Sequence, residues 1–166
     1  MDSKPPKVLL ISQNKIDKMI VQLANKIKKS KVKYDYVVGI ARGGLHISKP
    51  LSKMLGVPHK SIRISFYGNE FTIPCNYPKI LDLRGLEGLE EKKLLLIDDL
   101  VDAGNSFSWF EENAGCYFDY DIGVLYFNRQ NDKGVIPNYF VQEKRKTFLF
   151  EEKPVTSETF QKKRFC

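Results

Sequence analysis

The sequence holds few residues of the kinds that build metal centres or disulfide frameworks. Its three cysteines, Cys75, Cys116 and Cys166, include no C-x-x-C pair. Its two histidines, His46 and His59, are not spaced with the cysteines as zinc ligands are. We therefore expect incidental or buried thiols, because disulfides are rare in the cytosol. We expect neither a zinc site nor a catalytic centre based on histidine or cysteine.

Long apolar runs are also missing. No stretch approaches the roughly 18 consecutive apolar residues of a membrane span, and the apolar run in the opening MDSKPPKVLLIS is too short for a signal peptide. We therefore expect a cytoplasmic protein without membrane contact. The 166 residues, 42% of them hydrophobic, suffice for one domain with a buried core. The absence of an internal repeat or linker predicts a single domain over 1–166.

Positive charge is in excess, with a formal net charge of +7. Much of it lies in KIKKSKVK (26–33) and the tail QKKRFC, which a solvated helix face and a terminus explain. An RNA-binding protein is an alternative, but its aromatic residues would lie among the basic ones. Only Tyr34 and Tyr36 follow the lysine run, and we assign both to a strand. We expect no nucleic acid partner, whereas a small phosphorylated substrate would benefit from the positive field.

The apolar pattern predicts helices and strands in alternation. Apolar residues spaced by three and four indicate an amphipathic helix that Ser12 caps. Short apolar runs rich in β-forming residues indicate strands. The segment 68–92 has glycines and prolines and predicts a mobile loop or a hairpin. The expected elements are a helix over 12–30, a strand over 34–41, a helix over 45–56, strands over 59–67 and 92–98, a helix over 105–115, and strands over 121–128 and 138–143.

This alternation predicts an α/β fold with a doubly wound parallel sheet. Ligands of such sheets bind beyond the carboxyl ends of the strands. Two loops of small residues, ARGG (41–44) and DAGNS (102–106), follow strands at that edge. A further segment near the C-terminus, 146–152, is expected to form a binding loop. The predicted site therefore lies where these loops meet.

The loop over 102–106 has the features of a phosphate site. It leads directly into a helix, so its backbone N–H groups are unpaired and the positive end of the helix dipole lies behind them. Gly104 can adopt dihedral angles closed to other residues, and Asn105 and Ser106 can add side-chain donors.

Two acidic residues, Asp98 and Asp99, precede this loop. Carboxylates are poor partners for phosphate, but they accept hydrogen bonds from sugar hydroxyls and act through Mg²⁺. A phosphorylated sugar therefore suits both halves of the motif. The alternative is that the pair merely ends a strand at the solvent edge; the third acid, Asp102, and the glycine turn weaken it.

Two stretches of the sequence resemble motifs of a known family. LLLIDDLVDAGNSF (94–107) resembles the phosphoribosyl-diphosphate signature of the type I phosphoribosyltransferases. VVGIARGGLHISKPLSKMLGVPHKSIRISFY (37–67) is similar to a stretch of the small xanthine–guanine and hypoxanthine enzymes, with its S-R-G-G loop, helix and later Ser-Tyr. The likeness covers roughly 34–150. Two motifs in the right order are more specific than either alone.

The resemblance assigns roles to the two loops. It implies that Asp98 and Asp99 hold the ribose hydroxyls, directly or through Mg²⁺ bound by substrate or water. It implies that Arg42 and Gly43, with Ala41, bind the leaving diphosphate, and that a non-proline cis peptide lies between Ala41 and Arg42 or one position later. The 5′-phosphate would lie in the cradle formed by Asp102, Ala103, Gly104, Asn105 and Ser106.

The resemblance also implies a reaction, the displacement of diphosphate from the anomeric carbon by a purine nitrogen through an oxocarbenium-like transition state. Asp102 would take or share the proton of the base, and Arg42 and Mg²⁺ would stabilise the departing charge. A flexible loop around Ser65, Phe66 and Tyr67 would close to exclude water.

The base-binding residues depart from the family pattern. Asn128 stands where the family has a purine-binding Lys, unless Arg129 replaces that Lys with a shift of one residue. Phe148 stands at the usual Trp and would stack on the purine, and the backbone of Leu149 would contact its edge. Phe148 is alternatively a core aromatic residue. Ala103 replaces the usual Thr of the phosphate loop, which removes a hydroxyl donor.

We therefore expect a purine phosphoribosyltransferase that uses Mg²⁺, phosphoribosyl diphosphate and hypoxanthine, guanine or xanthine. The alternative is a nucleotide-binding or regulatory protein of the same fold with reduced or no transfer, which Ala103 and Asn128 motivate. Family members are commonly dimers or tetramers, so a homodimer or homotetramer is expected. Trp109, Phe110 and Tyr117 suit either an interface or the domain's own core.

Overall fold

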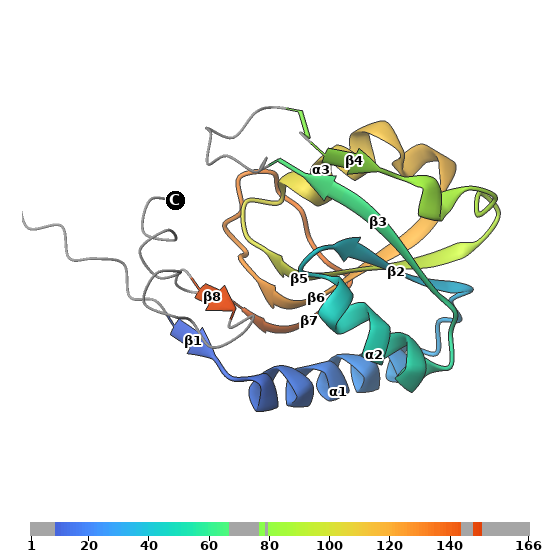
Figure 1. Ribbon diagram of the computed structural model, residues 1–166. Helices are drawn as coiled ribbons and strands as arrows, with labels where there is room; N and C mark the ends of the chain where they lie inside the picture. The colour runs from blue at the N-terminus through green and yellow to red at the C-terminus, as the bar shows by residue number, and fades with distance from the viewer. Residues whose placement is uncertain (1–8, 67–76, 79, 144–147, 151–166) are drawn as a thin grey trace, which may run out of the picture.

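The computed structural model describes residues 9–66, 77–78, 80–143 and 148–150. Its elements are β1 (Leu9–Ile11), α1 (Gln13–Ser30), β2 (Tyr36–Ala41), α2 (Leu45–Leu55), β3 (His59–Ser65), β4 (Ile80–Asp82), η1 (Arg84–Leu86), β5 (Lys93–Val101), α3 (Asn105–Asn113), η2 (Gly115–Tyr117), β6 (Asp119–Phe127), β7 (Tyr139–Glu143) and β8 (Phe148–Phe150). Six strands form one sheet in the order β4-β3-β2-β5-β6-β7, with β4 antiparallel to β3 and every other pair parallel. Helices α1 and α2 cover one face and α3 the other (Figure 1). The predicted α/β fold with a doubly wound parallel sheet is confirmed, and the edge strand β4 is its antiparallel exception.

A second, two-stranded sheet lies apart from the first. Strand β1 pairs in parallel with β8, with Leu9 opposite Phe148. Figure 1 shows this pair beside the β7 edge of the large sheet. The sequence did not predict β1, because three residues are too few to display a strand period. The segment 146–152 was expected to form a binding loop, with a buried strand as the alternative at Phe148, and its described residues form the short strand β8.

Most predicted elements occur close to their expected positions, with three differences. Ser12 stands at the N-cap of α1, but its side chain makes no capping hydrogen bond. The segment 68–92 contains β4 and η1, so its described part is the hairpin alternative and not an open loop. Strand β5 continues to Val101, so the acidic pair lies within the strand. The strand therefore extends beyond the two acids to a buried apolar residue, Val101.

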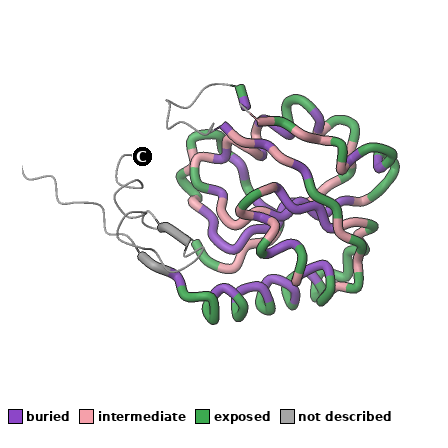
Figure 2. Tube along the Cα trace, in the orientation of Figure 1, coloured by how far each residue is buried: buried purple, intermediate pink, exposed green. Residues whose placement is uncertain are grey.

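The core consists of two clusters, one on each face of the sheet. Buried residues are concentrated in the central strands of the sheet (Figure 2). On the α3 face, Phe110 is fully buried and its ring packs edge-on against that of Tyr120 at 5.1 Å. Trp109 is also buried, whereas Tyr117 is 65% exposed. Trp109 and Phe110 thus belong to the domain's own core.

No helix among the described residues is long and apolar enough to cross a membrane.

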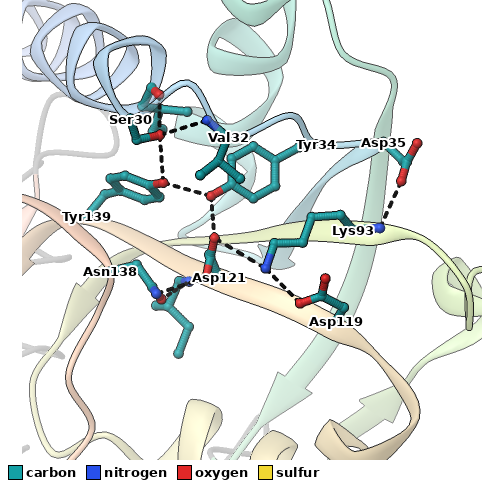
Figure 3. A network of polar contacts seen from close by, with 11 residues as sticks. Ser30, Val32, Tyr34, Asp35, Lys93, Asp119, Asp121, Asn138 and Tyr139 are labelled. Carbon is teal, nitrogen blue, oxygen red and sulfur yellow. Dashed lines mark hydrogen bonds and ion pairs between the residues drawn. The ribbon is translucent and has the colours of Figure 1, made fainter.

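Polar side chains join the amino ends of the strands (Figure 3). The Tyr34 hydroxyl donates to Asp121 and lies 2.8 Å from the Tyr139 hydroxyl. Lys93 Nζ lies 2.7 Å from Asp119 Oδ1 and 3.5 Å from Asp121 Oδ2. Burial and these hydrogen bonds raise the pKa of Tyr34, which stays protonated as a donor. We call these five residues the amino-edge network. They lie at the amino ends of the strands, opposite the carboxyl edge where the small-residue loops lie.

Candidate active site

A cleft of about 230 Å³ lies at the carboxyl end of β3 and β5. This is the edge at which ligands of parallel sheets bind. The volume exceeds that of several water molecules, each about 30 Å³. Its walls come from β3, β5 and the turn that opens α3. They are formed by Ile64, Ser65, Phe66, Asp98, Leu100, Asp102, Ala103, Gly104, Asn105, Ser106 and Phe107.

The turn over 102–106 forms one wall of this cleft. Gly104 has φ of +85°, a conformation that other residues rarely adopt, and α3 begins at the next residue. The first N–H groups of a helix have no partner within it. These groups and the positive end of the helix dipole form an anion site. The cleft therefore has a wall suited to phosphate.

The acidic pair connects this cleft with the loop after β2. Asp98 lines the cleft, and its Oδ1 accepts a hydrogen bond of 2.8 Å from the backbone N–H of Asp99. The Asp99 carboxylate lies against Gly43, where a Cβ atom would be 2.6 Å from Oδ2. Burial raises the pKa of the Asp98 carboxyl well above its usual range, and the charge of Asp99 raises it further. The acidic pair thus lies beside the loop after β2 and lines the cleft that the turn over 102–106 also lines.

The raised pKa of Asp98 leads to a prediction about stability. A carboxyl with a higher pKa in the folded state contributes stability at acidic pH, and that contribution is lost as the pH rises towards the folded pKa. Asp98→Asn removes the cost of ionisation, so we expect its Tm to exceed that of the wild type near neutral pH. Each 1 kcal/mol gained corresponds to about 2–4 °C in a chain of this size. Thermal unfolding without ligand checks this, and a difference that does not grow from about pH 4 to about pH 7 would contradict it.

The loop after β2 has the backbone expected of it. The peptide bond between Ala41 and Arg42 is cis, at the first of the two positions expected. The N–H of Gly44 donates to the carbonyl of Ile40 at 2.9 Å, and the N–H of Leu45 to that of Arg42 at 3.2 Å. The Arg42 side chain is exposed, so it can approach a ligand from solvent.

Two of the residues predicted to bind the base, Asn128 and Arg129, contact other residues of the chain. The Asn128 amide donates to the Asp102 carbonyl at 3.1 Å, and Arg129 is paired with Glu143 of β7. Neither residue lines the cleft. Phe148 and Leu149 lie in β8, and their side chains are outside the described residues, as is Tyr67. The described lining of the cleft therefore includes the phosphate turn but neither Asn128 nor Arg129.

Three apolar residues of the cleft were not anticipated: Ile64, Leu100 and Phe107. Strand alternation and helix periodicity assign each of them to the core, and they reach the cleft because it lies directly above that core. The sequence carried no separate signal for them.

The acidic pair is also a candidate set of ligands for a metal ion. The described residues include no group of three or more histidine, cysteine or acidic side chains that could hold one. Two adjacent carboxylates, one with a raised pKa because of burial and the other's charge, offer hard oxygen ligands and gain from a nearby cation. Asp98 and Asp99 thus fit a Mg²⁺ ion whose other ligands come from substrate and water.

Residues 9–108 match the family model of the phosphoribosyl transferase domain, a span that contains both loops and the acidic pair. The chain belongs to the phosphoribosyltransferase family. The resemblance found in the two sequence motifs is thereby confirmed. A comparison with curated protein sequences returned no match.

Solved structures of similar fold agree with this membership. A purine phosphoribosyltransferase from Pyrococcus horikoshii is 27% identical, with a TM-score of 0.70 over 89% of this chain and 96% of that one. A Trypanosoma cruzi hypoxanthine phosphoribosyltransferase in complex with its product IMP is 17% identical, with a TM-score of 0.69 over the full length of both chains. A Neisseria gonorrhoeae protein with bound ppGpp is 20% identical, with a TM-score of 0.69 over 96% of this chain and 95% of that one. The last two demonstrate a shared fold.

Proposed function

We propose that this phosphoribosyltransferase transfers phosphoribosyl from 5-phosphoribosyl 1-diphosphate to a 6-oxopurine base and releases diphosphate. One observation carries the proposal: the acidic pair connects the phosphate turn with the loop after β2. Asp98 shares the cleft with the turn, and Asp99 lies against Gly43. A substrate with a phosphate at one end, a diol in the middle and a diphosphate at the other matches this order of groups.

Each part of the site has one task in the proposed reaction. The N–H groups of the turn over 102–106 bind the 5′-phosphate. Asp98 and Asp99 orient the ribose hydroxyls, and Arg42 with the backbone of Ala41 and Gly43 binds the diphosphate. Bound Mg²⁺, held through Asp98 and Asp99 with substrate oxygens, would neutralise diphosphate charge.

The proposed chemistry exchanges two bonds at the anomeric carbon. The bond from this carbon to the diphosphate oxygen breaks with its electron pair leaving on diphosphate, and a bond to a purine nitrogen forms. Asp102, on the cleft wall, accepts the proton that this nitrogen loses. Ser65 and Phe66 line the same cleft, where closure would keep water from the activated sugar.

Base recognition in this proposal belongs to residues of β8. We propose that Phe148 stacks on the purine and that the Leu149 backbone contacts its edge, as the family resemblance implies. The P. horikoshii relative, at 27% identity, is named for purine transfer and favours a purine here. The single domain over 1–166, the cytoplasmic location and the homodimer or homotetramer remain predictions.

The proposed function is tested by binding and turnover together. Calorimetry with phosphoribosyl diphosphate and Mg²⁺ measures binding, and diphosphate release is then followed with hypoxanthine, guanine and xanthine in turn. We expect binding and release with at least one base. Binding without release would favour the nucleotide-binding or regulatory alternative, and absence of binding would contradict both.

Ala103 permits a test of the phosphate turn. It lines the cleft but has no hydroxyl. Ala103→Thr adds one donor, and a hydrogen bond to a charged group is worth about 1.5–3 kcal/mol, or about tenfold or more in Kd. We expect tighter binding of phosphoribosyl diphosphate by calorimetry. Ala103→Val, with the same shape and no hydroxyl, is the control, and equal tightening by both variants would contradict a phosphate contact.

A further inference from the structure

The turn between β6 and β7, residues 128–135, is held by its own side chains. Asn131 Nδ2 donates to the carbonyls of Asn128, at 3.0 Å, and Val135, at 2.8 Å. Asn131 Oδ1 accepts from the N–H of Val135 at 2.9 Å. A single amide side chain thus joins both ends of the turn, which fixes its shape. We call this segment the β6–β7 turn.

The β6–β7 turn packs directly on the phosphate turn. At Gly104, a Cβ atom would lie 2.9 Å from Asn131 Oδ1 and 3.1 Å from Val135 Cγ2. Val135 is only 7% exposed and belongs to the core cluster on the α3 face. The two turns are therefore in close contact, and a buried residue anchors the outer one.

Asn128 extends this contact to Asp102. Its backbone N–H donates to the Val101 carbonyl at 2.8 Å. Its Nδ2 atom lies 3.1 Å from the Asp102 carbonyl oxygen and 3.4 Å from Asp102 Oδ1. The N–H of Gln130 donates to Asn128 Oδ1 at 3.1 Å. This last bond fixes the orientation of the amide, because a flipped amide would point its N–H groups at another donor.

We infer that Asn128 is a positioning residue that aligns the Asp102 carboxylate, and that it does not bind the base. An amide has two N–H groups, and both acceptors near Nδ2 belong to Asp102. Neither N–H group is left to donate to a purine oxygen while these contacts persist. The inference rests on the proposed function, since the task of Asp102 there is to accept the proton of the base. It replaces the base-binding role that the family position implied for Asn128.

Two variants test the inference. Asn128→Ala removes the donor, and Asn128→Asp keeps an oxygen for the Gln130 N–H while replacing the donor with a carboxylate. Asn138→Ala is the matched control, because Asn138 Nδ2 also donates to an aspartate, Asp121 Oδ1 at 2.8 Å, at the far end of β6. Thermal unfolding confirms that each variant is folded, and Asn128→Asp serves if Asn128→Ala is not.

Steady-state kinetics use the base accepted by the wild type and its 8-aza analogue, whose extra ring nitrogen makes the transferred proton more acidic. We expect both Asn128 variants to lose about 10–100-fold in kcat, with the KM of the base within about threefold. We expect a smaller kcat loss with the 8-aza analogue, because its proton depends less on an aligned acceptor. The Asn138 control should retain its kcat.

The outcomes separate this inference from the proposed function. A rise of about tenfold or more in the KM of the base, with kcat retained, would assign Asn128 to base binding and overturn the inference alone. Equal kcat losses with the parent base and its 8-aza analogue would also overturn it, since alignment of a proton acceptor predicts unequal ones. A wild-type protein that releases no diphosphate with any base would contradict the proposed function itself.

Discussion

Replacing Asp102 with Asn is expected to lower kcat by about 10²–10⁴-fold, the usual contribution of a positioned proton acceptor. The carboxylate is on the cleft wall, and the amide that replaces it has the same shape but cannot accept the proton of the base. Binding of phosphoribosyl diphosphate should change little, because residue 102 contributes its backbone to the phosphate turn in both proteins. Single-turnover kinetics and calorimetry measure the two quantities separately.

Asp132→Asn provides a control for the change of charge. Asp132 is an exposed acid in the β6–β7 turn, near the same site but outside the cleft lining. Its replacement removes one negative charge and should leave kcat within about a factor of two, because exposed charges are screened. Equal rates for Asp102→Asn and the wild type would refute the assignment of Asp102 as the proton acceptor.

Replacing Gly43 with Ala should cost about 10²-fold or more in kcat/KM, because it displaces a carboxylate from the site. The added Cβ atom would lie 2.6 Å from Asp99 Oδ2 and 2.8 Å from Asp99 Cγ, distances that real contacts do not have. The group that must move is the end of a side chain, and Gly43 is not among the residues with positive φ. We therefore expect a large loss of activity with a small change in Tm.

A double-mutant cycle with Asp99→Ala decides whether the loss acts through that carboxylate. If Gly43→Ala works only by moving Asp99, the double variant is no less active than Asp99→Ala alone. If the fold-losses in kcat/KM of the two single variants instead multiply in the double variant, as for independent sites, Gly43 acts through the diphosphate loop itself. The measurement is kcat/KM for phosphoribosyl diphosphate in all four proteins.

The sequence predicted the parts of this protein whose signals are local. The period of α1 and the apolar run of β5 each extend over several residues, so they determine an element without help from distant partners. The phosphate turn is equally local, since Gly104 and the helix that follows it lie within a few residues of each other. The cis bond at Ala41 was expected from the family resemblance.

The remaining features depend on pairing across the chain. Strand β1 is a strand because β8 lies beside it, and the short β4 because β3 does. The amide of Asn128 contacts Asp102, 26 residues away, and no sequence period reports such a contact. The burial of Trp109 is also decided by tertiary packing, which sequence left open between a core and an interface.

The amino-edge network separates the scaffold of this enzyme from its chemistry. Its members join the segment before β2 to β5, β6 and β7 at one end of the sheet, while every residue of the cleft lies at the other. The loops at the carboxyl edge can therefore acquire substitutions without loosening the strands that carry them. Ala103 and Asn128 are two such departures from the family pattern. An arrangement of this kind gives the chain evolvability, because a change of substrate preference need not pass through an unstable intermediate.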